Sequence, residues 1–215
     1  MNKRIISLLM ALVMMLSLLP TPALAAEETP IRSESDLAAM AGGGYVLTGD
    51  IVLSDGWTPV ANFSGTLNGN GHTVTLAGKP LIQTIAGGGV VSNLILRGSV
   101  TSDSDVGSMA VMNNGTIRNC ISYADVTYTG NGGGAWFAHH VAGLVGYANV
   151  SDAVLSNSLY AGVLNYGSAQ AYGTLTNNGD FVKGTVTHCV GVGADRVGTS
   201  TGMSNDPIPD GDNRN

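Results

Sequence analysis

The sequence predicts an all-β chain that folds as a parallel β-solenoid, and three observations lead to this prediction. Apolar and polar residues alternate with a period of two in short runs rich in Val, Ile, Leu and Thr, which is the pattern of β-strands. One such run occurs four times, with a polar residue at the same position of each copy. Glycine is abundant, with 31 residues, whereas only 11% of the residues are charged, so the backbone has to satisfy its hydrogen bonds within regular structure.

Residues 1–25 are expected to be a secretory signal peptide. Lys3 and Arg4 precede the apolar run IISLLMALVMMLSLL, and the segment ends in the small-residue pattern ALA. A charged start, an apolar centre and an A-x-A end are typical of such a leader, and the apolar run is shorter than the roughly 20 residues of a membrane span. The mature chain is therefore expected to start at Ala26 and to be secreted, either extracellular or loosely associated with the cell surface.

The charge of the chain argues against two classes of partner. Nine basic residues face fifteen acidic ones, and two of the basic residues lie in the leader. An acidic surface repels phosphate groups, so nucleic acid and anionic membranes are not expected as partners. No membrane insertion is expected after cleavage of the leader. No cofactor is predicted, and the chain is expected to be a monomer.

The repeated unit occurs at Gly89–Val100, Gly115–Val126, Ala153–Leu164 and Gly184–Asp195. Its shared polar position falls, at separations of 26, 38 and 31 residues, on Asn93, Asn119, Asn157 and His188. Because the register holds while the period varies, each repeat is expected to be one coil, stacked about 4.8 Å from the next. The asparagine amides are then expected to hydrogen-bond along the stack, which is a structural role. A β-sandwich is the alternative, but it does not need the same residue in register.

The glycine-rich stretch FSGTLNGNGHTVTL is expected to turn the chain between two faces of one coil. Gly69 and Gly71 alternate with asparagines, and both residue types tolerate positive φ. His72 closes the turn, where its side chain is expected to hydrogen-bond to the backbone. No Lys-Ser or Lys-Thr pair follows the glycines, so they do not form a phosphate-binding loop.

Several motifs follow one another in a fixed order between residues 31 and 76, in the run IRSESDLAAMAGGGYVLTGDIVLSDGWTPVANFSGTLNGNGHTVTL. This run resembles the opening module of secreted and surface proteins of Gram-positive, gut-type bacteria. In that family a D-L helix leads into Y-x-L-T-x-D-I-x-L, W-x-P and F-x-G-T-L-x-G-x-G-H-T. The segment Ala142–Tyr147, with Gly143 and Gly146, resembles the GLUG motif of the same group. The resemblance covers roughly residues 31–165.

The resemblance implies a right-handed parallel β-helix of the pectin-lyase-like fold over residues 45–195. Residues 26–44 are expected to be an N-terminal capping segment, and residues 196–215, rich in Pro, Asp and Asn, a disordered tail. Ser33 with Asp36 three residues later fits a helix N-cap. A helix over residues 33–40 is expected to cover the edge of the first coil, which would otherwise template pairing with another chain.

The family also implies a function, because its members are surface stalks or adhesive modules. A non-enzymatic adhesion protein is therefore expected, binding a glycan or a host or bacterial surface protein along one face of the solenoid. Parallel β-helices also include pectate lyases and related enzymes, so a polysaccharide lyase or glycoside hydrolase is the first alternative. A truncated paralogue without independent function is the second.

No catalytic residues are predicted. The acidic residues are scattered, and the close pair Asp103 and Asp105 is interpreted as a solvated loop rather than as a catalytic dyad. Arg97 and Arg118 do not share a register position, so neither is placed as the cationic base of a lyase.

Four aromatic residues are the candidates for ligand binding, because exposed rings can stack on sugars: Trp136, Phe137, Tyr128 and Tyr123. Packing of these rings in the core or in ordinary loops is the alternative, and it is the interpretation that the sequence favours. His139 and His140 come two and three residues after Phe137, but consecutive residues of a strand point to opposite faces. No metal site is therefore predicted.

Cys120 and Cys189 occupy one register position, directly after Asn119 and His188. One coil lies between them, so their separation is about 9.6 Å, twice the strand spacing. This exceeds the roughly 7 Å limit on the Cα separation of a disulfide. The sequence therefore predicts two buried free thiols.

Overall fold

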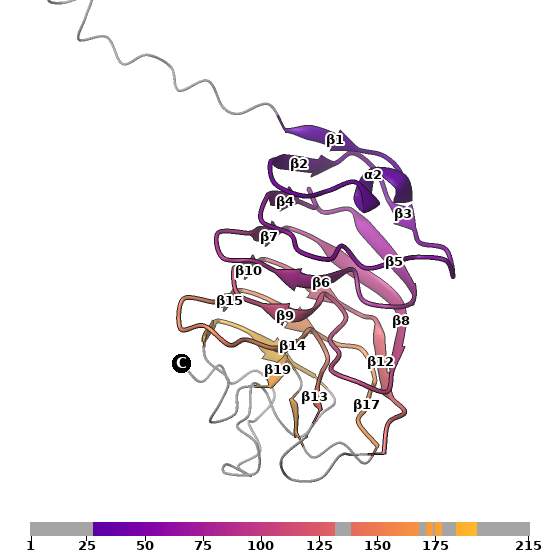
Figure 1. Ribbon diagram of the computed structural model, residues 1–215, viewed down its shortest axis with the longest axis vertical. Coiled ribbons are helices and arrows are strands. Elements are labelled where there is room, and N and C mark those ends of the chain that lie inside the picture. Colours follow the sequence, from indigo (N-terminus) through magenta and orange to yellow (C-terminus); the bar gives the residue numbers. More distant parts are fainter. Residues whose placement is uncertain (1–27, 132–138, 168–170, 174, 178–183, 193–215) are drawn as a thin grey trace, which may run out of the picture.

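The computed structural model describes residues 28–131, 139–167, 171–173, 175–177 and 184–192. The predicted leader and tail lie outside this part of the chain. Within it, the single helix is α2 (Glu34–Ala38), and every strand pair runs parallel (Figure 1). No helix in the described residues is long and apolar enough to cross a membrane. The all-β, all-parallel architecture is consistent with the predicted parallel β-helix.

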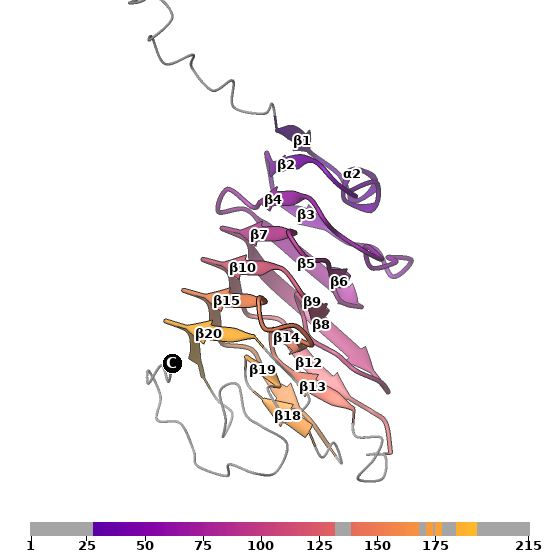
Figure 2. The same ribbon diagram turned by 60° about the vertical axis from the view of Figure 1, so that its left-hand side comes forward.

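Three parallel sheets, each built from strands stacked along the molecule, contain most of the strands. In spatial order, the first sheet contains β1 (Thr29–Ile31), β2 (Gly44–Leu47), β4 (Thr66–Asn68), β7 (Val90–Ser92), β10 (Thr116–Arg118), β15 (Val154–Ser156) and β20 (Thr185–Thr187). Figure 2 shows these strands as a ladder that follows the order of the sequence. Each strand of the first sheet therefore begins a new coil.

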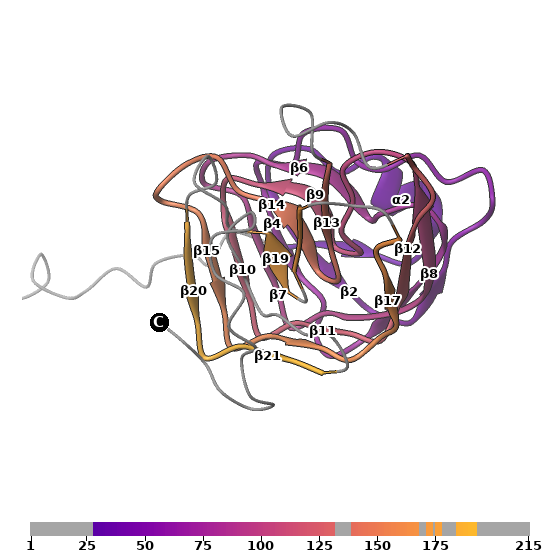
Figure 3. The same cartoon turned by 90° about the horizontal axis from the view of Figure 1, so that it is seen from below.

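The second sheet collects the next strands of each coil: β3 (Ile51–Val52), β5 (Thr73–Gly78), β8 (Ile95–Ser102), β11 (Ile121–Ser122), β12 (Asp125–Tyr128), β16 (Leu159–Tyr160), β17 (Leu164–Asn165) and β21 (Val190–Gly191). The third sheet contains β6 (Ile82–Ile85), β9 (Ala110–Asn113), β14 (Val145–Tyr147) and β19 (Thr176–Asn177), and β13 (His140–Ala142) pairs with β18 (Ala171–Gly173). Seen along the stack, the strands surround one interior (Figure 3).

The core is built from columns of apolar residues that point inward at the same register position. Leu67, Val91 and Ile117 pair across β4, β7 and β10, and each is fully buried. Burying such a side chain stabilises the fold by about 1.5–3 kcal/mol. The period-two pattern of the short strands thus places one residue of each strand in the core and its neighbours outside.

The repeated asparagines lie at the corner between the first and second sheets. Asn93, Asn119, Asn157 and His188 all have a left-handed backbone, with φ between 47° and 56°. Asn119 Nδ2 donates to Asn93 Oδ1 at 3.2 Å, and Asn93 Nδ2 donates to Asn68 Oδ1 at 3.0 Å. The ladder thus starts one coil earlier than predicted, and the described residues show no such bond from Asn157. Asparagine recurs here mainly because it tolerates this conformation.

The glycine-rich turn before β5 is longer than the other corners. Gly71 has φ +78°, and a Cβ on Gly69 would lie 2.6 Å from the carbonyl oxygen of Asn93. The side chain of His72 was predicted to hydrogen-bond to the backbone, but it contacts a carboxylate instead. Its Nδ1 lies 3.3 Å from Asp50 Oδ1, an oxygen that also accepts the Thr73 amide at 2.9 Å. The carboxylate was missed because it comes from the preceding coil.

The N-terminal segment differs from its prediction in extent. Ser33 is the N-cap of α2, with its Oγ accepting the Asp36 amide at 3.2 Å, as the capping pattern predicts. The helix is shorter than expected, although Leu37 is fully buried against the core. Strand β1 already pairs with β2, so the first sheet begins inside the predicted capping segment. Pro30 in this edge strand lacks an amide donor, which limits pairing with another chain.

Of the two glycines of the GLUG-like segment, Gly143 lies between β13 and β14, and Gly146 lies within β14. The Gly143 carbonyl accepts a hydrogen bond from the buried Ser108 hydroxyl at 2.6 Å. A Cβ on Gly146 would lie 2.5 Å from the carbonyl oxygen of Val111 on the preceding coil. Only glycine fits this approach between two backbones.

Candidate functional site

The outer face of the second sheet is continuous over the coils. In β8, Leu96 and Val100 point into the core, whereas Arg97 points outward. The strand registers place residues of successive coils beside Arg97 in one outer column, which runs Val52, Thr75, Arg97, Tyr123, Ala161 and Val192. Neighbouring members come from adjacent strands, about 4.8 Å apart.

Exposed hydrophobic side chains gather on this face. The described part of the chain exposes five large ones, and four belong to the second sheet or its direct continuation: Val52 at 73%, Tyr123 at 39%, Val163 at 56% and Val192 at 43%. Val163 lies opposite Asp125, one outward position beyond the outer column. The fifth, Val150, lies in the loop before β15. Their location on one face makes this face the candidate surface for interaction.

A second column runs beside the outer column, nearer the asparagine corner. It consists of half-buried apolar side chains in direct register: Ile95, Ile121, Leu159 and Val190. We call the two columns together with Val163 the apolar face. Its residues stand on regular strands, so the surface is held by the backbone ladder rather than by loops.

Arg97 and Tyr123 form the polar centre of the apolar face. The guanidinium carbon of Arg97 lies 4.8 Å from the centroid of the Tyr123 ring. The Tyr123 amide donates to the Leu96 carbonyl at 2.9 Å, which fixes the two residues side by side. No carboxylate in the described residues lies within 4.0 Å of the guanidinium. Asp125, further along the same face, accepts the Val163 amide at 2.9 Å.

The predicted aromatic candidates have different environments. Tyr123 is exposed, but Tyr128 is only 4% exposed and packs in the core cluster. Its prediction as an exposed stacking residue is therefore wrong, because the period-two pattern of β12 directs it inward. Trp136 and Phe137 lie outside the described residues. The exposed face could have been found in the repeat itself, since Arg97 and Tyr123 each come four residues after the repeated asparagine.

The carboxylate of Asp105 contacts both histidine side chains. The Nδ1 atoms of His139 and His140 lie 3.5 and 3.3 Å from its Oδ1, and the His140 amide donates to the same oxygen at 2.7 Å. Burial raises the pKa of Asp105, but the hydrogen bonds from His140 and the charges of both imidazoles outweigh it and hold the pKa below its usual value. Asp105 lies in a loop, as predicted, but its side chain is half-buried and paired with the histidines rather than solvated, whereas Asp103 is exposed.

The two imidazoles do not diverge as predicted, because His139 precedes β13 and escapes the strand alternation. Their rings pack on Tyr128 and Tyr147, with centroid distances of 5.9 and 4.7 Å. In the described ranges, no group of three or more His, Cys, Asp and Glu side chains is arranged to hold a metal ion.

The thiols are buried and unpaired, as predicted. Cys120 and Cys189 lie at one corner position with Leu94 and Ser158, and the Ser158 hydroxyl accepts the Cys120 amide at 3.1 Å. Burial raises the pKa of Cys120 to about 12 and that of Cys189 to about 11. A thiol in this state is a poor nucleophile, so neither cysteine is a candidate for covalent catalysis.

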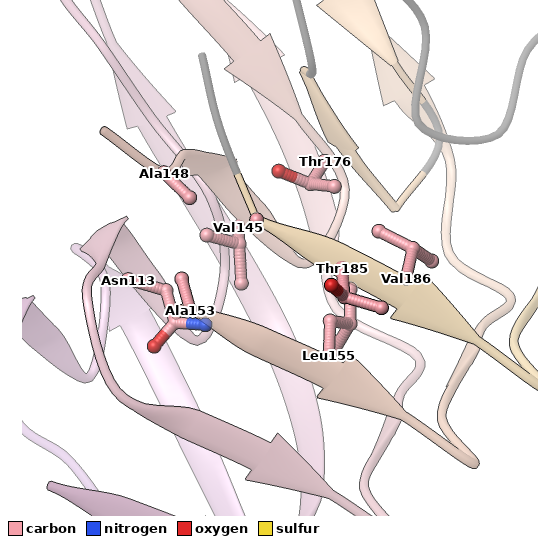
Figure 4. Close-up of a pocket in the computed structure, with 9 residues that line it drawn as sticks. Asn113, Val145, Ala148, Ala153, Leu155, Thr176, Thr185 and Val186 are labelled. Carbon is pink, nitrogen blue, oxygen red and sulfur yellow. The ribbon is translucent and has the colours of Figure 1, made fainter. Parts of the chain in front are cut away.

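A small cavity lies between the first and third sheets near the last described coil (Figure 4). Its volume is about 10 Å³, close to the minimum for one water molecule. Thr176 Oγ1 borders it and is the one buried side-chain polar atom in the described residues that has no hydrogen-bond partner. The cavity is too small for a sugar or a peptide side chain, so it is not a candidate site for such a ligand.

Comparison with known proteins gives one partial similarity. No protein-family model matches the chain, and no solved structure matches it. Halomucin of Haloquadratum walsbyi is 36% identical over 137 residues, which cover 53% of this chain and 1% of halomucin. The chain is thus similar to one short part of a much longer protein.

Proposed function

We propose that this chain is a secreted, non-enzymatic surface module that binds a glycan or a surface protein through the apolar face. The observation that carries the proposal is the gathering of exposed hydrophobic side chains on the outer face of the second sheet. Monomeric proteins seldom leave such surfaces without a partner. The module acts as a monomer and without a cofactor.

The module is a right-handed parallel β-helix with GLUG-type repeats. Each connection from one strand of the first sheet to the next is a crossover between parallel strands, and such crossovers are almost always right-handed. The motif order between residues 31 and 76 supports membership of the Gram-positive surface proteins. The similarity to part of halomucin, whose name places it among the mucins, supports a role outside the cell.

Two observations favour binding over catalysis. Asp105 is held by two histidines and a backbone amide rather than by a second carboxylate, so it lacks the paired acid of a glycoside hydrolase. The Cys120 and Cys189 thiols are kept protonated by burial.

The test is a binding screen of the mature chain from Ala26 against a glycan array that includes uronate polymers, and against bacterial and host surface proteins. The triple variant Val52→Thr, Val163→Thr and Val192→Thr keeps β-branched side chains but replaces one methyl group of each with a hydroxyl group. Because a buried methyl group contributes about 0.8 kcal/mol, binding is expected to weaken about tenfold or more.

The matched control is Val150→Thr, which makes the same change at an exposed valine outside the apolar face. Its affinity is expected to equal that of the unmodified chain. Release of unsaturated uronate products, followed by ultraviolet absorbance, would contradict the non-enzymatic proposal. Equal loss of binding in the control and in the triple variant would contradict the location of the site.

A further inference from the structure

We propose that the ligand of the apolar face is an anionic glycan, whose carboxylate or sulfate binds Arg97 while the sugar ring packs on Tyr123 and Ile121. This inference rests on the proposed function and specifies the chemistry of its ligand. It follows from the position of Arg97, the exposed cation of this face, whose guanidinium lies over the Tyr123 ring and has no carboxylate within 4.0 Å in the described residues.

The position of the Arg97 side chain is restricted by its strand and by an aromatic ring, which favours binding of an anion. Arg97 stands on β8, whose strand is paired on both sides, and its guanidinium lies over the Tyr123 ring at 4.8 Å. Stacking on an aromatic ring reduces the freedom of the long side chain but leaves the N–H groups at the edge of the guanidinium plane available. That planar fork matches a carboxylate or sulfate in two parallel hydrogen bonds. In a chain of net charge −6, such a cation is expected to select the charge of the ligand.

The surroundings of Arg97 favour a sugar over an acidic peptide. Peptides that add to a sheet need a free strand edge and pockets for alternate side chains. The strand β8 has neighbours on both sides, and the one described cavity, of about 10 Å³, lies elsewhere. What the face does offer is an exposed aromatic ring beside half-buried aliphatic side chains on regular strands. The apolar face of a sugar ring fits such a surface.

Asp125 determines the side from which the anion approaches. It lies one outward position beyond Tyr123, and its carboxylate already accepts the Val163 amide at 2.9 Å. A ligand carboxylate next to Asp125 would be repelled. The ligand is therefore placed on the side of Arg97 away from Asp125, with its sugar ring toward Ile121, and the removal of the Asp125 charge is expected to strengthen binding.

The experiment measures the affinity of the mature chain for four probes: a uronate oligosaccharide, its carboxyl-reduced neutral counterpart, a sulfated oligosaccharide and an oligoglutamate peptide. The variant Arg97→Gln is expected to weaken binding of the anionic sugars about tenfold or more and to reduce its dependence on salt. The control Arg118→Gln removes an exposed arginine of the first sheet and is expected to leave the affinity unchanged. Asp125→Asn is expected to increase it.

The outcomes separate this inference from the proposed function. Preference for the uronate or for the sulfated sugar would support the inference and identify which anion is bound. Equal affinity for the neutral sugar, or tighter binding of the peptide, would overturn the inference and leave a binding face in place. If no glycan and no surface protein binds the chain, the proposed function itself fails.

Discussion

The side-chain amide of Asn119 donates to the carbonyl oxygen of Asn93 at 3.2 Å, across one coil at the corner between the first and second sheets. Both residues have a left-handed backbone, with φ 56° and 55°. The corner therefore combines a local conformation that most residues avoid with a contact between coils. This combination explains why asparagine recurs at intervals that vary in length.

Replacement of Asn119 separates these two roles. Asn119→Ala places a Cβ-bearing residue without a polar side chain in the left-handed region, and the free energy of unfolding is expected to fall by about 1–2 kcal/mol for the backbone alone. Asn119→Gly removes only the amide contact and is expected to lose about 1 kcal/mol or less. Urea unfolding measures both values, and an alanine variant as stable as the glycine variant would contradict the backbone role.

Gly146 tests the close approach between coils. A Cβ added there would lie 2.5 Å from the Val111 carbonyl oxygen, so Gly146→Ala forces two backbones apart and is expected to cost about 1–3 kcal/mol of unfolding free energy. Gly49 is the matched control, because a Cβ there meets no atom within 4 Å. Thermal or urea unfolding compares them, and equal stability of the two variants would show that the coils are not packed this closely.

Asp105 makes stability depend on pH. Its folded-state pKa is lowered, so its contribution to stability is present above the pKa of the unfolded chain, about 3.9, and is lost as the pH falls through the folded-state value. Asp105→Asn is expected to lower the unfolding free energy by about 1 kcal/mol at neutral pH. The difference from the unmodified chain is expected to shrink in acid, as measured by urea unfolding over a pH series.

The exposed neighbour Asp103 supplies the control for this pH dependence. Asp103→Asn is expected to leave the unfolding free energy within about 0.5 kcal/mol of the original at every pH. A constant difference between Asp105→Asn and the unmodified chain from neutral to acid pH would mean that the carboxylate charge is not the cause.

The two thiols are expected to be inert in the folded chain. Burial raises the pKa of Cys120 to about 12 and that of Cys189 to about 11, so almost no thiolate forms at neutral pH. Alkylation followed by mass spectrometry is expected to label neither residue before denaturant is added and both afterwards. Rapid labelling of the folded chain, or two thiols that resist labelling when unfolded without a reductant, would contradict this.

Much of the fold follows from the repeat, because register is a property that sequence spacing records directly. The shared register position of Asn93 and Asn119 predicted that the two residues stack. The next position in the unit, occupied by Cys120 and Cys189, predicted two buried thiols too far apart to bond. Strand β1 was not predicted, since three residues with a central Pro30 show no alternation. It is a strand only because β2 pairs with it.

The candidate site was less predictable from the sequence. Val52, Val163 and Val192 are far apart in the chain, and only the strand pairings place them on one face. The inward direction of Tyr128 depends on a four-residue strand whose phase was not fixed beforehand. Likewise, the contact of His139 and His140 with Asp105 crosses from one coil to the next.

The location of the binding face is the central claim, and chemical-shift mapping tests it most directly. Amide resonances of the mature chain would be recorded during titration with the uronate oligosaccharide. We predict that the shifts gather at Arg97, Tyr123 and Ala161, in adjacent coils of the second sheet, and leave Thr116 on the first sheet unchanged. Shifts gathered at Thr116, or around Asp105 and the histidines, would contradict the account.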